Sequence, residues 1–322
     1  MEITNITTFT QELVNGVQEA LGEGFEIETR PVEKMNEKYD ALTVKPVDGI
    51  IGVNLNATSL FEEYENGKAF DRIVDEAVKV AKTALANTPD FDVESYKDYS
   101  IMKDKLAMEV VSAEANKDLL KTVPHKDIED MAIVYRFVLE NVPGQGIGTI
   151  LVTNQLLEGY GITAEQLHKD ALEIAPKNRP LEIKGMGEVL AQQMGVEDLA
   201  MLGLNIPPEE EKMFVASVEG NVHGACVLAY EEFMDKAAKR VGGSFYILPS
   251  SIHEILLIPD DGQFELTALD QMVREVNATT VSASDKLTDN VYHYDCDAKI
   301  FETGEKFIIR HAEEAEKKEG IA

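Results

Sequence analysis

The most informative segment of the chain for its fold is Ser244–Gly262, SFYILPSSIHEILLIPDDG. Two apolar runs flank the polar insert PSSIHE, and the turn signal PDDG follows directly. Two β-prone runs joined by so short a connection pair as antiparallel neighbours. The stretch therefore predicts a core hairpin or a bent strand, and its bend carries two serines, a histidine and a glutamate.

The rest of the chain continues this mixture of short strands and helices. Apolar spacing predicts helices over 9–21, 70–85, 163–174, 184–194, 231–241 and 266–276. We expect strands over 25–32, 41–47, 49–56, 132–139, 148–154, 213–218, 225–230 and 290–301. An apolar and acidic segment lies between a strand and a following helix at 60–64 and 156–160, with a looser copy at 229–233. The pattern predicts an α+β fold, with helices packed on mostly antiparallel sheets and a repeated strand-to-helix unit.

Two polar segments suggest how the chain is divided. NTPDFDVESYKDYS follows the second expected helix, and PPEEEK follows residue 206. These segments predict α+β units over 1–95, 96–206 and 207–322, which pack as one or two domains.

Charge is the strongest deviation in composition. The chain has 59 acidic and 30 basic residues, so its formal net charge is −29. A field of this sign repels nucleic acid and anionic membranes, which favours a basic protein partner. Two alternatives are a mimic of DNA and a merely soluble acidic surface. The first residues lack the basic start and continuous apolar stretch of a signal peptide and no later run reaches the length of a spanning helix, so we expect neither, and two cysteines exclude a disulfide framework. We therefore expect a cytoplasmic protein.

The polar insert offers the atoms of a hydrolase. Ser250 or Ser251, His253 and Glu254 supply a nucleophile, a base and an acid next to Pro249. Alternate residues of a strand stand about 7 Å apart, which is too far for a direct contact between nucleophile and base. The other interpretation is that Pro249 bends the strand and the serine hydroxyls bond backbone groups.

Both cysteines occur in the same pattern, three residues after a histidine. His223 precedes Cys226, and His293 precedes Cys296. Two imidazoles and two thiolates suit zinc. Residues three positions apart on a strand face opposite sides of the sheet, however. The histidine and cysteine of each pair can therefore bind one metal ion only if they lie at a turn. Buried cysteines and surface histidines are the alternative, and we expect no cofactor because GQGIG matches no phosphate-binding fingerprint.

Three stretches carry a resemblance to a known family. They are YGITAEQLHKDALE, GVNLNATSLFEEYENG and GGSFYILPSSIHEILLIPDDG, of which ILPSSIHE is the most specific. With them the chain resembles an uncharacterised family of bacterial proteins, found chiefly in anaerobic Gram-positive species. It is also similar to a second uncharacterised family that shares the GIT-E-LH helix. The resemblance implies a bacterial origin and no particular activity.

Two functions remain after these observations. The first is a non-enzymatic binding or regulatory protein whose acidic surface engages a basic partner, and it rests on the charge. The second is a hydrolase or metal-dependent enzyme with a site near His253, completed by residues distant in sequence. The absence of a complete catalytic signature favours the first.

Overall fold

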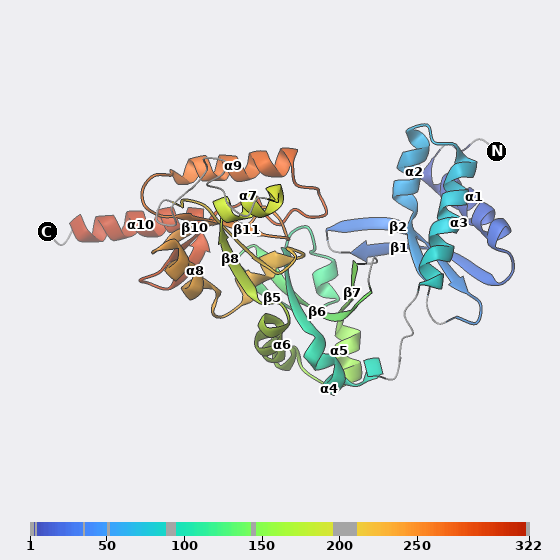
Figure 1. Cartoon of the computed structure of the whole chain (residues 1–322), viewed down its shortest axis with the longest axis horizontal. Helices are drawn as coiled ribbons and strands as arrows, with labels where there is room; N and C mark the ends of the chain where they lie inside the picture. The colour runs from blue at the N-terminus through green and yellow to red at the C-terminus, as the bar shows by residue number, and fades with distance from the viewer. Residues whose placement is uncertain are drawn as a thin grey trace. The chain divides into compact units, whose positions relative to one another are not determined.

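The structure is a computed structural model. It describes residues 3, 5–34, 36–49, 52–87, 95–142, 146–195 and 211–319. Contacts divide the chain into two compact units, Met1–Asp92 and Val93–Ala322 (Figure 1). Helices pack on antiparallel sheets in each unit, so the predicted α+β class is confirmed.

Unit 1 is a three-stranded sheet covered by helices. The strands run in the order β1 (Phe25–Lys34), β2 (Glu37–Pro46) and β3 (Val53–Asn56), and each neighbouring pair is antiparallel. The helices are α1 (Ile6–Leu21), α2 (Ala57–Glu65) and α3 (Phe70–Ala86). Figure 1 shows α1 and α3 side by side, and both contribute to the core of the unit.

Helix α1 shows why the sequence folds this way locally. Asn5 caps its start, because the side chain accepts a hydrogen bond of 2.9 Å from the backbone of Thr8. Its fully buried residues are four apart, which places them on one face of a helix. Gly22 ends it with a φ of 80°, a conformation that glycine adopts without a steric penalty.

Unit 2 contains a six-stranded antiparallel sheet. Its order is β13 (Ile300–Thr303), β12 (Tyr292–Asp295), β10 (Phe245–Leu248), β11 (Ile255–Pro259), β9 (Phe214–Val218) and β8 (Leu181–Gly185). Alternate residues of the central strands enter two different cores, which makes these strands apolar on both faces. In Figure 1, α9 (Leu266–Thr279) and α7 (Met186–Met194) are drawn above this sheet and α8 (Phe233–Val241) below it, while α10 (Gly304–Glu319) lies at the left, beside the C-terminus.

A second, four-stranded sheet completes unit 2. Strand β6 (Met131–Val142) lies between β4 (Leu106–Ser112) on one side and β5 (His125–Ile128) and β7 (Gly146–Leu151) on the other. Helix α6 (Ala164–Asn178) packs on β4, and α4 (Tyr99–Met102) and α5 (Asn154–Tyr160) lie beside it. Thr163 caps α6 as predicted, accepting a hydrogen bond of 3.2 Å from Gln166.

The hairpin predicted from SFYILPSSIHEILLIPDDG is confirmed. Strands β10 and β11 are antiparallel neighbours, with Phe245 opposite Pro259 and Leu248 opposite Leu256. The PSSIHE insert is the connection between them. Both strands are buried in the centre of the sheet, so the stretch does form the core of unit 2.

The strand expected over 225–230 is wrong. Gly224–Ala229 forms a 3₁₀ helix instead, and all six of its residues are buried. A short apolar run that is buried on all sides has no periodicity to distinguish a strand from a helix. The third copy of the strand-to-helix unit therefore lacks its strand, whereas the first two lie within α2 and α5, which follow β3 and β7.

The expected middle and C-terminal segments share one hydrophobic core in unit 2. Phe137 from the middle segment and Phe245 from the C-terminal segment both belong to it. The first boundary of the chain lies between Asp92 and Val93. Most of the PPEEEK run lies outside the described residues. No helix in the described ranges is long and apolar enough to cross a membrane.

Candidate functional site

The candidate site starts from charged side chains on one face of the four-stranded sheet. Ala107 pairs with Arg136, and Val138 pairs with Thr149. Because alternate residues of a strand share a face, Glu109 stands on the same side as Arg136 and Thr149. The opposite face enters the core with α6. The charged face lies against the 3₁₀ helix Gly224–Ala229.

Glu109 is a buried carboxylate that two basic side chains contact. Only 2% of its side chain is exposed. One carboxylate oxygen accepts from Nε of Arg136, and the other contacts Nδ1 of His223. Burial acts to raise the pKa of Glu109, but His223 and the Arg136 charge outweigh it and hold this pKa below its ordinary value. Glu109 is therefore an ionised group inside the protein at neutral pH.

His223 reaches Glu109 from a tight turn between β9 and the 3₁₀ helix. Gly220, Asn221 and His223 all have positive φ values, and that of His223 is 53°. Such values are uncommon outside glycine, although asparagine and histidine adopt them more often than most residues. A conformation of this kind persists only where neighbouring contacts hold it. The turn places one edge of the imidazole against Glu109 and leaves 34% of the side chain exposed.

The PSSIHE insert holds this turn in place. Nδ1 of His253 accepts a hydrogen bond of 3.2 Å from the backbone N–H of His223. The backbone oxygen of His253 accepts from Gly224, at 2.9 Å, and from the hydroxyl of Ser217, at 2.9 Å. The two imidazole rings lie 5.5 Å apart, centre to centre. His253 is thus placed to support the conformation of His223.

Gly224 is required by this close approach. A Cβ atom at this position would lie 1.9 Å from the hydroxyl oxygen of Ser217 and 2.4 Å from the backbone oxygen of His253. Neither distance is compatible with van der Waals contact. The HG pair at 223–224 therefore combines a side chain that faces the site with a residue that lets two backbones meet.

Glu109, Arg136 and His223 line a cavity of about 420 Å³. Its lining includes Glu109, Arg136, Thr149, Arg179, Glu219 and His223. Cavities of about 300–1,000 Å³ commonly hold small molecules. The site therefore combines enough space for a ligand with a buried carboxylate, an imidazole and two guanidinium groups.

The two arginines are only partly engaged. Arg136 donates from Nη1 to the hydroxyl of Thr149 at 3.0 Å, in addition to its contact with Glu109. Arg179 follows the last residue of α6 and donates from Nη2 to the backbone oxygen of Val222. A guanidinium has five N–H groups. Each arginine thus keeps donors that bond no group in the described part of the chain.

The geometry suits acid–base chemistry. Nδ1 of His223 contacts the Glu109 carboxylate, which can only accept hydrogen bonds, so this contact favours the tautomer with its hydrogen on Nδ1. In the neutral imidazole this leaves Nε2 with a free lone pair. Nε2 forms no hydrogen bond within the described ranges, so this nitrogen can take a proton from a water or a substrate bound in the cavity.

The structure places the predicted hydrolase residues beside this cavity rather than in its lining. The Ser251 hydroxyl accepts a hydrogen bond of 3.1 Å from the backbone of His253, as expected if the serines serve the bend. Pro249, Ser250 and Glu254 are not among the lining residues of the described cavity. Nε2 of His253 lies 3.5 Å from an oxygen of Asp285, which gives this ring its own acidic neighbour.

The four predicted metal ligands are distributed over different parts of unit 2. Cys226 is buried in the 3₁₀ helix, where burial raises the pKa of its thiol to about 11. The sulfur of Cys296 accepts a hydrogen bond from the Ser244 hydroxyl, and its side chain packs against the larger core of unit 2. His293 packs on the opposite side of its sheet, stacked on Phe307. No cluster of three metal-binding side chains occurs among the described residues.

His293 instead has a structural environment. Its ring is 2% exposed, and Nε2 lies 3.0 Å from an oxygen of Asp260. Burial lowers the pKa of His293, and the Asp260 carboxylate opposes this effect only in part. The buried Nδ1 bonds no group in the part of the chain that the structure describes. The ring is therefore a neutral element of the core at neutral pH.

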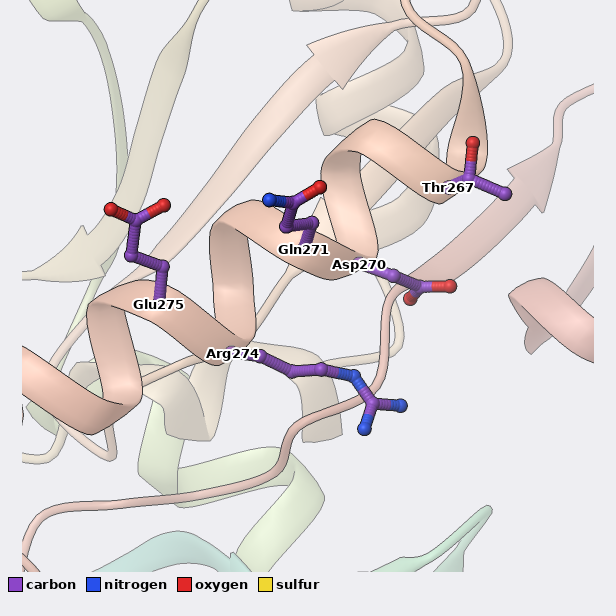
Figure 2. A pocket seen from close by; sticks show the side chains of 5 residues that line it. All are labelled: Thr267, Asp270, Gln271, Arg274 and Glu275. Atoms are coloured by element: carbon purple, nitrogen blue, oxygen red, sulfur yellow. The ribbon is translucent and has the colours of Figure 1, made fainter.

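A second hollow, on α9, does not form a comparable site. Its lining consists of five polar side chains from a single helix: Thr267, Asp270, Gln271, Arg274 and Glu275. Figure 2 shows them spread along the helix, with Arg274 and Glu275 pointing in different directions. Because these side chains do not converge, they define no ligand position.

The sequence-based prediction of the site does not include Glu109 or Arg136. Each is a lone charged residue in an apolar strand, in LAMEVVS and in IVYRFVL. A charge in a strand that is buried on both faces must be paired. That signal could have marked both residues. Their partner His223 could not have been found in this way, because the fold brings it from a distant turn.

Fold and site together define a class of protein: a two-unit α+β protein with a carboxylate–histidine pair at a small cavity. The chain belongs to a family of unknown function (DUF5688), whose match covers residues 6–296. Membership of an uncharacterised family is thereby confirmed. Searches of curated proteins and of solved structures found no match.

Proposed function

We propose that the chain is an enzyme that catalyses hydrolysis of a small molecule in the cavity of unit 2. The observation that carries this proposal is the contact between buried Glu109 and Nδ1 of His223. A carboxylate that orients an imidazole is the arrangement by which hydrolases prepare a general base. The site lies near His253, but His223 is the base.

Each residue of the site has a distinct role in this reaction. His223 takes a proton from water through Nε2, and Glu109 stabilises the imidazolium that forms. We take water as the nucleophile, because the described lining contains no serine or cysteine and its threonine hydroxyl, on Thr149, is bonded by Arg136. Arg136 keeps Glu109 ionised and in position. His253 acts through the backbone of His223 and is a positioning residue.

Blocking the cavity tests whether the reaction takes place there. Val222 lines the cavity and is 41% exposed, so a Val222→Trp variant fills the space without replacing any charged group of the site. We expect it to lose the hydrolysis of p-nitrophenyl acetate or p-nitrophenyl phosphate that the wild type shows. Release of p-nitrophenol, followed by absorbance, is the measurement.

The matched control is Val276→Trp, at a position on α9 that is 37% exposed. It should hydrolyse the probe at the wild-type rate. Equal turnover in the two variants would contradict the proposal, as would a wild type that hydrolyses neither probe. Circular dichroism spectra establish that both variants are folded.

The net charge of −29 supports a second function, namely recruitment of a basic protein partner in the bacterial cytoplasm. Neither cysteine is in a disulfide, in keeping with a reducing compartment. Capture of such a partner would weaken as salt is added, because salt screens the attraction. Hydrolysis in the cavity and binding of a basic partner are compatible functions, because an interaction at the charged surface can bring the enzyme to the location where it acts.

A further inference from the structure

We infer that the cavity of unit 2 takes the oxyanion group of its substrate, a carboxylate or a phosphate, between Arg136 and Arg179. This inference rests on the proposed function for the identity of the site. It adds the substrate class, which the carboxylate–histidine pair alone does not specify.

The first observation is the placement of the arginines. The chain contains seven, and two of them line this one cavity although the net charge is −29. Guanidinium groups match carboxylate and phosphate oxygens with paired N–H donors. A cavity with two such groups is suited to an oxyanion.

The second observation is the charge that remains after the ion pairs are formed. Glu109 is paired with the Arg136 guanidinium and contacts His223, so its negative charge does not act on a ligand unopposed. Arg179 makes no ion pair among the described residues, because its contact is with the uncharged backbone oxygen of Val222. Glu219 is exposed, where water screens its charge. Arg179 is therefore the cation with the least competition for a ligand.

The third observation is the position of the base. His223 lines the same cavity as both arginines. A ligand whose oxyanion group contacts them is thus held beside Nε2 of His223. Binding of this group would orient the rest of the substrate for attack by water.

Thermal unfolding at constant ionic strength tests this inference, with inorganic phosphate or acetate replacing chloride. A ligand that binds the folded state raises the midpoint of unfolding. We expect phosphate, acetate or both to raise the midpoint of the wild type. Arg179→Gln should weaken the apparent affinity by about tenfold or more, the effect of losing one charged hydrogen bond. Its backbone oxygen, which accepts from Tyr230 at 2.8 Å, is unchanged.

Two further variants separate the outcomes. Arg274→Gln, on the exposed side of α9, removes the same charge elsewhere and should bind as the wild type does. Arg179→Lys keeps the charge but not the paired donors, so it should bind with intermediate affinity. Stabilisation of the wild type by neither anion, or equal affinity in Arg179→Gln and Arg274→Gln, would overturn the inference.

The inference and the proposed function can fail independently. His223→Asn removes the base but neither arginine, so this variant should still bind the anion. Anion binding by a wild type that hydrolyses neither probe would contradict the proposed function but not the oxyanion site. Turnover of p-nitrophenyl acetate without any anion binding would sink the oxyanion site alone.

Discussion

The His223→Asn variant should lose turnover by about 10²–10⁴-fold, the usual contribution of general acid–base catalysis. The asparagine amide can still donate to Glu109 in place of Nδ1, but it has no atom in the place of Nε2. It also tolerates the positive φ of 53° at this position. The loss should therefore appear in the rate of hydrolysis and not in stability.

The measurement is kcat/KM for whichever p-nitrophenyl probe the wild type hydrolyses. His311→Asn is the matched control, because His311 lies exposed on α10 and does not line the cavity. A His223→Asn variant with wild-type turnover would exclude His223 as the base. A loss of the same size in His311→Asn would show that the effect is not specific to the site.

Removal of Glu109 should produce the largest loss of stability. Breaking a buried ion pair by deleting one partner costs about 3–5 kcal/mol, because the other charge stays buried and uncompensated. Glu109→Gln should therefore lower the free energy of unfolding of unit 2 by about this amount at pH 7. Urea unfolding followed by circular dichroism measures it. Glu114→Gln, at an exposed position, should change stability by less than about 0.5 kcal/mol.

The ion pair between Glu109 and Arg136 also predicts how the free energy of unfolding depends on pH. The pKa of Glu109 in the folded protein lies below its ordinary value of 4.5. Its contribution is therefore complete above pH 4.5 and is lost as the pH falls through the folded-state pKa. The difference in stability between the wild type and Glu109→Gln should narrow in acid. A difference that stayed constant or widened below pH 4.5 would contradict an ionised Glu109.

A double variant separates the pair from its members. Replacing Glu109 by leucine and Arg136 by methionine removes both charges and keeps apolar volume in their place. Replacement of a buried ion pair by apolar groups is often neutral or stabilising. The double variant should therefore be more stable than Glu109→Gln. If it is equally unstable, packing at this position, and not an unpaired charge, explains the loss.

Much of the fold was accessible from the sequence because the signals were local. The apolar runs on either side of PSSIHE formed the predicted hairpin, and the Thr163 hydroxyl caps α6 as expected. The strand expected at 225–230 failed because burial on all sides removes periodicity. Local signals do not predict that the middle and C-terminal segments share one core, because this arrangement depends on contacts between distant residues.

The site was only partly accessible for the same reason. The sequence pattern marks both histidines as candidates, His223 as a metal ligand with Cys226 and His253 as a base with Ser251. The structure instead brings the two histidines together, at 5.5 Å between ring centres. Glu109 joins them through the pairing of β4 with β6 and the packing of the 3₁₀ helix on that sheet. No local spacing encodes that contact.

The tautomer of His223 tests most directly whether Glu109 prepares this histidine as a base. Nitrogen-15 NMR of the histidine rings can measure it, with the His223→Asn variant assigning the resonance. The neutral ring of His223 should carry its proton on Nδ1, facing Glu109, and Glu109→Gln should shift this resonance. A proton that stays on Nε2, with no response to Glu109→Gln, would contradict the account.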